Sequence, residues 1–173
     1  YDRHRRGLPL GEPRSDLTFA QNFLYMLNAE MPTPTMVKAF DVCMILHADH
    51  GLNNSTFAAR VIISTKSDMY SAMTGAIGSL RGPLHGGANE EVMEMLGQIP
   101  SVDAVEPYVM DKLKHRHEGA RISGFGHRVY KAYDPRATFL KTLAKQLAHD
   151  TGNQALYDKS MKIEEIMARE VAA

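Results

Sequence analysis

The sequence has few of the features that define disulfide-bonded or membrane-spanning proteins. Cys43 is the only cysteine in the 173 residues, so neither a disulfide framework nor a thiolate metal site can form within the chain. No apolar run approaches the roughly 18 residues that a membrane span needs, and the opening stretch YDRHRRGLPLGEPRS lacks the apolar segment of a signal peptide. These absences predict a soluble protein in a reducing, cytoplasmic setting.

An excess of charge of either sign is also absent. The 20 Lys and Arg residues balance the 20 Asp and Glu residues, so the formal net charge is zero. No overall electrostatic field therefore attracts nucleic acid or an anionic membrane, and we predict neither as a partner. Any anionic ligand would have to be bound by a local group of cations. The chain begins at Tyr1 in a segment rich in arginine and proline, from which we expect that a longer protein contains it.

Apolar residues recur at helical spacing over most of the chain, and no alternating pattern typical of strands competes with them. Proline and glycine separate these segments. We assign VIIS, residues 61–64, to a helix because it continues the apolar spacing of Phe57 and Ala58. The predicted helices cover about 15–30, 34–50, 54–65, 69–80, 87–97, 102–117, 135–151 and 153–170. The sequence therefore predicts an all-α fold with one sizeable core or two small lobes.

The first candidate group is the motif HADH, residues 47–50, at the end of the predicted helix 34–50. At helical spacing, His47 and His50 continue an apolar face formed by Met36, Phe40 and Cys43. Taken alone, this pattern is more typical of hydrogen-bonded core histidines than of a functional pair. No Glu, Cys or third His stands at a spacing that completes a metal shell on this helix, so we predict no metal site.

The second candidate group is His85 in SLRGPLHGGANEEVMEML, residues 79–96, directly before a predicted helix. The unpaired N–H groups and the dipole of a helix N-terminus disfavour an imidazolium there. A neutral imidazole can donate its N–H to an oxygen that becomes negative, as in enolisation. Gly86 and Gly87 would allow a close approach of backbone or ligand. The alternative is a glycine hinge, at about 82–87, with an incidental histidine.

The third candidate group is GFGHRVYKAYDPRA, residues 124–137. Two glycines precede His127, and Asp134 and Pro135 have the pattern of an N-cap and a first helical residue. Arg136 would then lie in the first helical turn, where its charge is unfavourable to the dipole. This placement indicates a bound anion, most simply a carboxylate held by two hydrogen bonds, although a surface arginine is the alternative.

Arg121, Arg128 and Lys131 make the same region locally basic in a chain of zero net charge. Such a region suits a ligand that carries phosphate, and a solvated basic loop would have the same composition. Together, histidines at separate helix ends and an arginine-bearing loop indicate a dicarboxylate or keto-acid site that uses neutral hydrogen-bond donors.

Three motifs in this order resemble those of citrate synthases: MILHADHGLNNST, GPLHGGANE and GFGHRVYKAYDPRA. The resemblance covers essentially the whole chain and is to the short bacterial and archaeal form, which includes 2-methylcitrate synthases. It implies an all-α fold with a large domain that dimerises through packed helices and a smaller domain that closes over CoA. Residues 1–85 would belong to the large domain and 86–173 to the small one.

The implied reaction condenses acetyl-CoA with oxaloacetate and then hydrolyses the thioester to citrate and CoA, in a homodimer. The CoA thioester is a substrate, and no metal or redox cofactor is implied. By motif position, His85 would form a hydrogen bond with the thioester oxygen and stabilise the enol. His50 would polarise the keto group of oxaloacetate. His127 and Arg136 would hold oxaloacetate. The implied contacts to CoA are Arg121, Ile122 and Lys131.

The resemblance also implies a carboxylate base, because the methyl protons of a thioester are far less acidic than any side chain. In the family this aspartate lies beyond the third motif, in a segment that the chain does not include. Asp111, Asp150 and Asp158 offer no evident substitute. We therefore expect the 173-residue chain by itself to be inactive or nearly so.

Three alternatives remain open at this point. A 2-methylcitrate synthase would take propionyl-CoA, and one methylene is worth only about 1–3 kcal/mol in a pocket. A helical metal phosphohydrolase of the HD type has a His-Asp pair at a comparable helix end. Here Asp49 precedes His50, and the outer ligands are not evident. A non-catalytic interaction fragment would bind neither oxaloacetate nor CoA.

Overall fold

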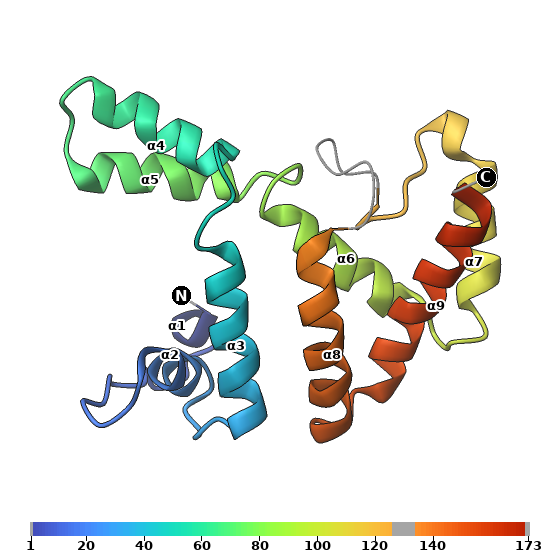
Figure 1. The fold of residues 1–173 in the computed structure, drawn as a ribbon, viewed down its shortest axis with the longest axis horizontal. Helices are drawn as coiled ribbons and strands as arrows, with labels where there is room; N and C mark the ends of the chain where they lie inside the picture. Colours follow the sequence, from blue (N-terminus) through green and yellow to red (C-terminus); the bar gives the residue numbers. More distant parts are fainter. Residues whose placement is uncertain (1, 126–133, 172–173) are drawn as a thin grey trace. The chain divides into compact units, whose positions relative to one another are not determined.

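The computed structural model describes residues 2–125 and 134–171, and every regular element in these ranges is a helix (Figure 1). The all-α prediction and the eight predicted helices are confirmed, and 61–64 lies inside a helix. The short first helix and the 3₁₀ turn were not predicted. The elements are α1 (Asp2–Arg5), α2 (Phe19–Asn28), α3 (Pro34–His47), α4 (Asn54–Ser64), α5 (Met69–Leu80), α6 (Gly87–Gln98), α7 (Val105–Lys114), η1 (Arg116–Glu118), α8 (Pro135–Asp150) and α9 (Gln154–Val171). None of these helices is long and apolar enough to cross a membrane.

Side-chain caps explain where several helices begin. Thr33 accepts the backbone N–H of Met36 ahead of α3, at 3.2 Å. Asn53 accepts that of Thr56 ahead of α4, at 3.0 Å. Asp68 accepts that of Ser71 ahead of α5, at 2.8 Å. Each cap satisfies one N–H that has no partner within its helix, so the starting residue is set locally.

The chain divides into two compact units. Unit 1 comprises residues 1–49 and 134–153, and unit 2 comprises 50–133 and 154–173. Each unit is therefore built from two stretches of sequence. This grouping of contacts differs from the expected division at residue 85, and the domain boundary of the intact protein stays a prediction.

Unit 1 contains α1, α2, α3 and α8. Helix α3 packs against α8 and also contacts α2. The rings of Phe23 in α2 and Phe40 in α3 stack with centroids 4.5 Å apart. The Thr35 hydroxyl, in the first turn of α3, donates to the Asp150 carboxylate at the end of α8, at 2.7 Å. An apolar contact and a polar contact thus hold the helices of this unit together.

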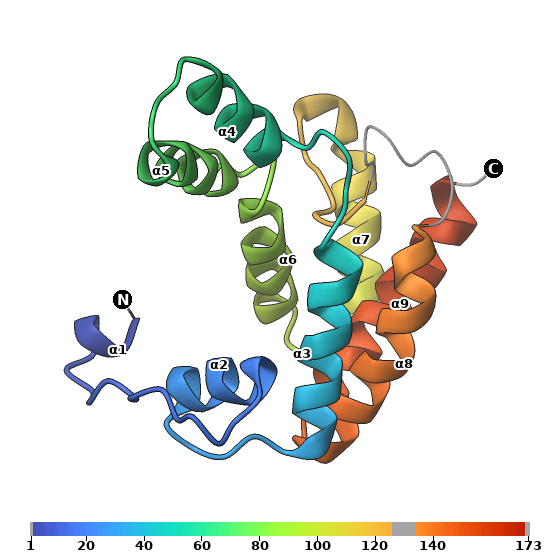
Figure 2. The same ribbon diagram turned by 60° about the vertical axis from the view of Figure 1, so that its left-hand side comes forward.

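Unit 2 has its core where α6, α7 and α9 meet (Figures 1 and 2). The largest fully buried side chains lie there, on these helices and on the residue that follows α6: Ile99, Val105, Val109, Ile163 and Ile166. In the same unit, α4 and α5 form an antiparallel hairpin, the upper left pair in both views. A Cβ on Gly75 would lie 2.1 Å from Ile62 Cδ1, so this glycine lets the two helices approach closely.

The predicted helix 34–50 is shorter than expected. It ends at His47 with Ala48 as the C-cap, and Asp49 and His50 lie outside any helix. Gly51 then takes a φ of 59°, a left-handed conformation that favours glycine. The expectation that His47 and His50 share one inward helical face is therefore wrong. His47 is exposed, and its Nδ1 is 2.7 Å from the Cys43 carbonyl oxygen.

Candidate active site

A hydrogen bond between Ser55 and His85 forms the centre of the candidate site. Ser55 is the second residue of α4, and His85 lies 30 residues later, just before α6. The Ser55 Oγ is 2.7 Å from His85 Nε2, and both residues are partly buried. The same hydroxyl lies 3.0 Å from the Ala76 carbonyl oxygen in α5, to which it can donate. Ser55 therefore links His85 to both helices of the hairpin.

The single hydrogen of the Ser55 hydroxyl determines which ring nitrogen of His85 carries a proton. If the hydroxyl donates to Ala76, then His85 Nε2 must be the donor to Ser55. If the hydroxyl donates to His85 instead, then Nε2 accepts, and a neutral ring carries its proton on Nδ1. Among the described residues Nδ1 has no hydrogen-bond partner, so it is the nitrogen available to a ligand.

The turn that carries His85 is tightly bonded. The Gly82 carbonyl oxygen accepts the N–H groups of His85 at 2.9 Å and of Gly87 at 3.1 Å, and the His85 carbonyl oxygen accepts that of Ala88 at 3.2 Å. Helix α6 begins at Gly87 with Gly86 as its N-cap. The predicted place of His85, directly before a helix N-terminus, is confirmed.

Gly86 and Gly87 are required for space, not for an unusual conformation. Gly86 has a φ of −65°, which any residue can adopt. A Cβ there would lie 2.5 Å from the Leu80 carbonyl oxygen, and one on Gly87 would lie 2.9 Å from that of Gly82. Backbone oxygens cannot move aside as a flexible side chain can. The glycines therefore let the turn fold back on the end of α5, a close approach of backbone that the sequence predicted.

His50 lies at the same end of the hairpin as His85. His50 comes three residues before the Asn53 cap of α4, and His85 comes five residues after Leu80, the last residue of α5. The hairpin is antiparallel, so the start of α4 and the end of α5 are neighbours (Figure 1). The fold thus brings His50 and His85, the two predicted catalytic histidines, to the same end of the α4–α5 hairpin. Sequence reasoning did not select Ser55, although it stands inside the first motif, two residues after the cap.

Arg136 has a carboxylate partner within the chain. Asp134 and Pro135 are the N-cap and first residue of α8, as predicted. The Asp134 carboxylate accepts from Arg136 Nε at 3.1 Å and from Nη2 at 2.7 Å. Because Asp134 is itself an anion, the position of Arg136 in the first turn of α8 does not by itself require a bound ligand. Arg136 belongs to unit 1, whereas His50 and His85 belong to unit 2.

Of the four remaining predicted site residues, the structure describes two, Arg121 and Ile122. His127 and Lys131 lie outside the described residues. The Ile122 side chain is 8% exposed and belongs to the core of unit 2, so any contact it makes with CoA would be through its backbone. Arg121 is exposed and lines a pocket of about 180 Å³ with Ser123 and residues of α6 and α7. Arg121 therefore remains accessible to a ligand.

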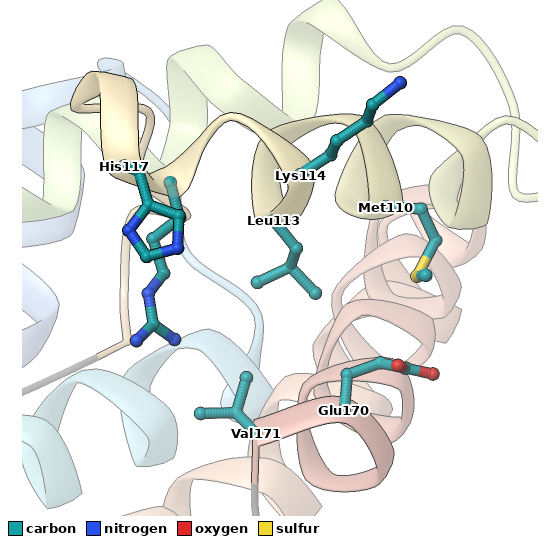
Figure 3. A pocket seen from close by; sticks show the side chains of 7 residues that line it. Met110, Leu113, Lys114, His117, Glu170 and Val171 are labelled. Atoms are coloured by element: carbon teal, nitrogen blue, oxygen red, sulfur yellow. The ribbon is translucent and has the colours of Figure 1, made fainter.

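A pocket of about 400 Å³ lies between the end of α7, η1 and the end of α9. In Figure 3 the Leu113 and Val171 side chains point toward each other, and the Lys114 amine points away from them. None of the predicted site residues lines this pocket. It is therefore separate from the candidate active site.

Metal ligands and a reactive thiol are two further features that decide which chemistry a site can perform. Within residues 2–125 and 134–171, no three His, Cys, Asp or Glu side chains are grouped so that they could hold a metal ion. Burial raises the pKa of the Cys43 thiol above its ordinary value, which favours the protonated form. Cys43 is thus a poor candidate for a thiolate nucleophile.

The described elements are all helices, and the candidate site centres on a histidine that a serine hydroxyl holds just before a helix. The chain belongs to the citrate synthase family. The family model described as "Citrate synthase, C-terminal domain" matches residues 1–173. The resemblance stated from the three motifs is confirmed, and it sets aside the reading as an HD-type phosphohydrolase.

Curated relatives carry two names. The chain is 53% identical over 170 residues to "Citrate synthase 2" of Bacillus subtilis, a match that covers 98% of this chain and 45% of that protein. It is 45% identical over 171 residues to the "2-methylcitrate synthase" of Mycobacterium tuberculosis, covering 99% of this chain and 42% of that protein. The chain therefore spans less than half the length of these relatives.

Solved structures agree with the fold. The citrate synthase of Thermotoga maritima matches with a TM-score of 0.80 and 44% identity, over 96% of this chain and 44% of that one. The citrate synthase of Thermoplasma acidophilum matches with a TM-score of 0.88 and 35% identity, over the same shares of 96% and 44%. The latter structure is a ternary complex with carboxymethyl coenzyme A and oxaloacetate.

Proposed function

We propose that the intact protein is an acyltransferase that condenses acetyl-CoA with oxaloacetate and releases citrate and CoA. The hydrogen bond between Ser55 and His85, in a turn that leads into a helix N-terminus, is the observation that carries this proposal. The names of the relatives and the ligands of the Thermoplasma acidophilum structure support it. The CoA thioester is a substrate in this proposal, and no separate cofactor is assigned.

In the proposed reaction His85 stabilises the enol of the acyl group. Because Nε2 is held by Ser55, the donor to the thioester oxygen is Nδ1. A neutral ring carries a proton on Nδ1 only when Nε2 accepts from the Ser55 hydroxyl, which then no longer donates to Ala76. Ser55 would thus set the tautomer as well as the orientation of the ring. A fixed donor aimed at an oxygen that becomes negative is a large source of rate enhancement.

The other residues have proposed roles at the second substrate. His50 would polarise the keto group of oxaloacetate, and Arg136 would bind a carboxylate. His127 is proposed for oxaloacetate and Lys131 for CoA on the motif alone. The carboxylate base would come from a part of the family sequence beyond the third motif. Arg121 and the Ile122 backbone would lie along CoA.

The experiment is thiol release from acetyl-CoA by the intact protein, with and without oxaloacetate. Oxaloacetate-dependent release is expected, and His85→Ala should lower kcat by about 10²–10³-fold, the loss seen for a transition-state donor. Ser55→Ala should lower kcat as well, and Ser55→Thr, which keeps the hydroxyl, should lower it less. The matched control is His115→Ala, which should leave kcat unchanged, because His115 is the C-cap of α7 and its Nδ1 lies 2.8 Å from the Asp111 carbonyl oxygen, not at the candidate site. Absence of release would contradict the proposal, and the next step would be metal analysis.

A second candidate is 2-methylcitrate synthase, favoured by the 45% identity to the Mycobacterium tuberculosis protein. Propionyl-CoA differs from acetyl-CoA by one methylene, so one site can accept both. The ratio of kcat/KM for the two thioesters, each with oxaloacetate, decides between them. A ratio above one for propionyl-CoA would assign the methylcitrate reaction.

We also propose that the intact protein is a cytoplasmic homodimer. The α4–α5 hairpin supports the dimer, because a large part of its apolar surface is exposed. On α5, Met69, Met73 and Ile77 recur every four residues and are 67%, 50% and 62% exposed. On α4, Phe57 and Val61 are 56% and 50% exposed. An apolar stripe of this kind on two adjacent helices is typical of a surface that a second copy covers.

A further inference from the structure

The Asp134 carboxylate makes two kinds of contact at the start of α8. Its Oδ1 accepts the backbone N–H of Arg136 at 2.9 Å, which caps the helix. Its two oxygens also accept from the Arg136 side chain, Oδ1 from Nε at 3.1 Å and Oδ2 from Nη2 at 2.7 Å. One carboxylate therefore fixes both the helix start and the guanidinium of the residue two positions later.

This pairing sets the direction of the guanidinium. The group is planar, and its Nε and Nη2 edge faces Asp134, so Nη1 lies on the opposite side. The side chains are 22% exposed for Arg136 and 31% for Asp134, which makes the pair less screened than a fully exposed one. Pro135 stands between them with a fixed φ, so the backbone that joins the pair is also restricted.

The charge of Asp134 has a further effect at this position. A guanidinium beside a helix N-terminus is opposed by the helix dipole, and a carboxylate there is favoured. Asp134 offsets that unfavourable term and keeps Arg136 at the first turn of α8. An arginine that is already oriented loses less side-chain entropy when it binds a second carboxylate.

We propose that Asp134 is a positioning residue, which orients Arg136 for the carboxylate of oxaloacetate. This inference rests on the proposed function and goes beyond it, because the resemblance implies a role for Arg136 and none for Asp134. Asp134 does not touch the substrate in this proposal and acts only through the guanidinium. Its contribution is therefore to the binding of oxaloacetate and not to the binding of the CoA thioester.

The test separates the cap from the ion pair in the intact protein. Asp134→Asn keeps an oxygen that can cap α8, and Asn caps as well as Asp. The amide also places an NH₂ group against the guanidinium N–H groups, so the pairing is lost. Asp134→Ser likewise keeps a capping oxygen and is too short to bind both guanidinium nitrogens. The matched control is Asp68→Asn, because Asp68 caps α5 through Ser71.

We expect Asp134→Asn and Asp134→Ser each to raise the KM for oxaloacetate about tenfold, with kcat and the KM for the acyl-CoA changed by less than about twofold. Asp68→Asn should change none of the three constants. If the wild type is active and both Asp134 variants keep its KM for oxaloacetate, or lower it, the positioning role is overturned and Asp134 is only a cap. If the wild type shows no oxaloacetate-dependent release, the proposed function itself is overturned.

Discussion

At the scale of single residues, the candidate site depends on two glycines and one hydroxyl. The glycine content of residues 82–87 predicts a hinge, which stays a prediction. In the structure these residues form a turn closed by backbone hydrogen bonds, with no room for a Cβ at Gly86. Glycine is needed at 86 and 87 because Leu80 and Gly82 occupy the space that a side chain would need.

Replacing Gly86 with alanine should displace this turn. The added Cβ would lie 2.5 Å from the Leu80 carbonyl oxygen, so we expect a loss of about 1–3 kcal/mol in the free energy of unfolding, typical of overpacking. Gly97→Ala is the control, because a Cβ there meets nothing within 4 Å. Since Gly97 lies inside α6, that change should stabilise by about 0.5–1 kcal/mol. Urea unfolding of both variants measures this, and equal effects would contradict it.

At the scale of elements, helix ends are held by groups from other helices. The Lys159 ammonium, on α9, donates to the carbonyl oxygens of Leu96, at 3.3 Å, and of Ile99. These oxygens lie at the C-terminal end of α6, where the last carbonyls have no partner within the helix and the dipole favours a cation. Lys159 thus joins α9 to the helix that follows His85.

Removing this ammonium should destabilise the protein. Lys159→Met keeps most of the side-chain bulk and leaves the α6 carbonyls without the charged donor, so we expect a loss of about 1–2 kcal/mol. Lys162→Met on the same helix is the matched control. Lys162 pairs with Glu165 three residues later, and such a pair is worth about 0.5 kcal/mol or less. Denaturant unfolding compares the two, and a smaller effect at Lys159 would refute its capping role.

The contact between α3 and α8 should depend on pH. A hydrogen bond from Thr35, followed in importance by one from His149, lowers the pKa of Asp150. A carboxyl whose pKa is lower in the folded state stabilises that state above its unfolded pKa, near 3.9, and loses this effect as the pH falls through the folded value. The bond between Thr35 and Asp150 should therefore stabilise unit 1 at neutral pH and not in strong acid.

Thr35→Val tests this directly, with Thr35→Ser as the control that keeps the hydroxyl. The valine variant should raise the pKa of Asp150 toward its ordinary value, as followed by carboxyl NMR titration. Its deficit in unfolding free energy should be present at neutral pH and shrink as the pH falls below about 4. A deficit that is independent of pH would assign the effect to packing of the side chain.

At the scale of the whole molecule, the exposed stripe on α5 is the basis for the proposed dimer. Ile77→Arg places a charge in the stripe and should convert a dimer of the intact protein to a monomer, as measured by light scattering during size-exclusion chromatography. Lys66→Glu is the control, because Lys66 lies in the loop between α4 and α5. Met73→Glu is a second variant in the stripe, in case the first does not fold. A monomeric wild type would contradict the proposed dimer.

The sequence by itself determined where most helices lie and where one catalytic candidate stands. The helix starts at Pro34, Asn54, Met69 and Pro135 were predicted within a residue, because capping and apolar spacing act over about four residues. The place of His85 before α6 follows from the same local rules. The end of α3 could not be predicted from these rules. Ala48 and Asp49 are not residues that typically end a helix, and the left-handed residue comes only at Gly51.

Only the tertiary structure decided which of these residues meet. The bond from Ser55 to His85 spans 30 residues and depends on the pairing of α4 with α5. Ile122 is buried in a core to which α6, α7 and α9 all contribute, and α9 follows it in sequence. The pairing of Asp134 with Arg136 is by contrast local, because the two residues are only two positions apart. Local rules fix φ and ψ over a few residues, whereas contacts between distant side chains are set by the packing of whole helices.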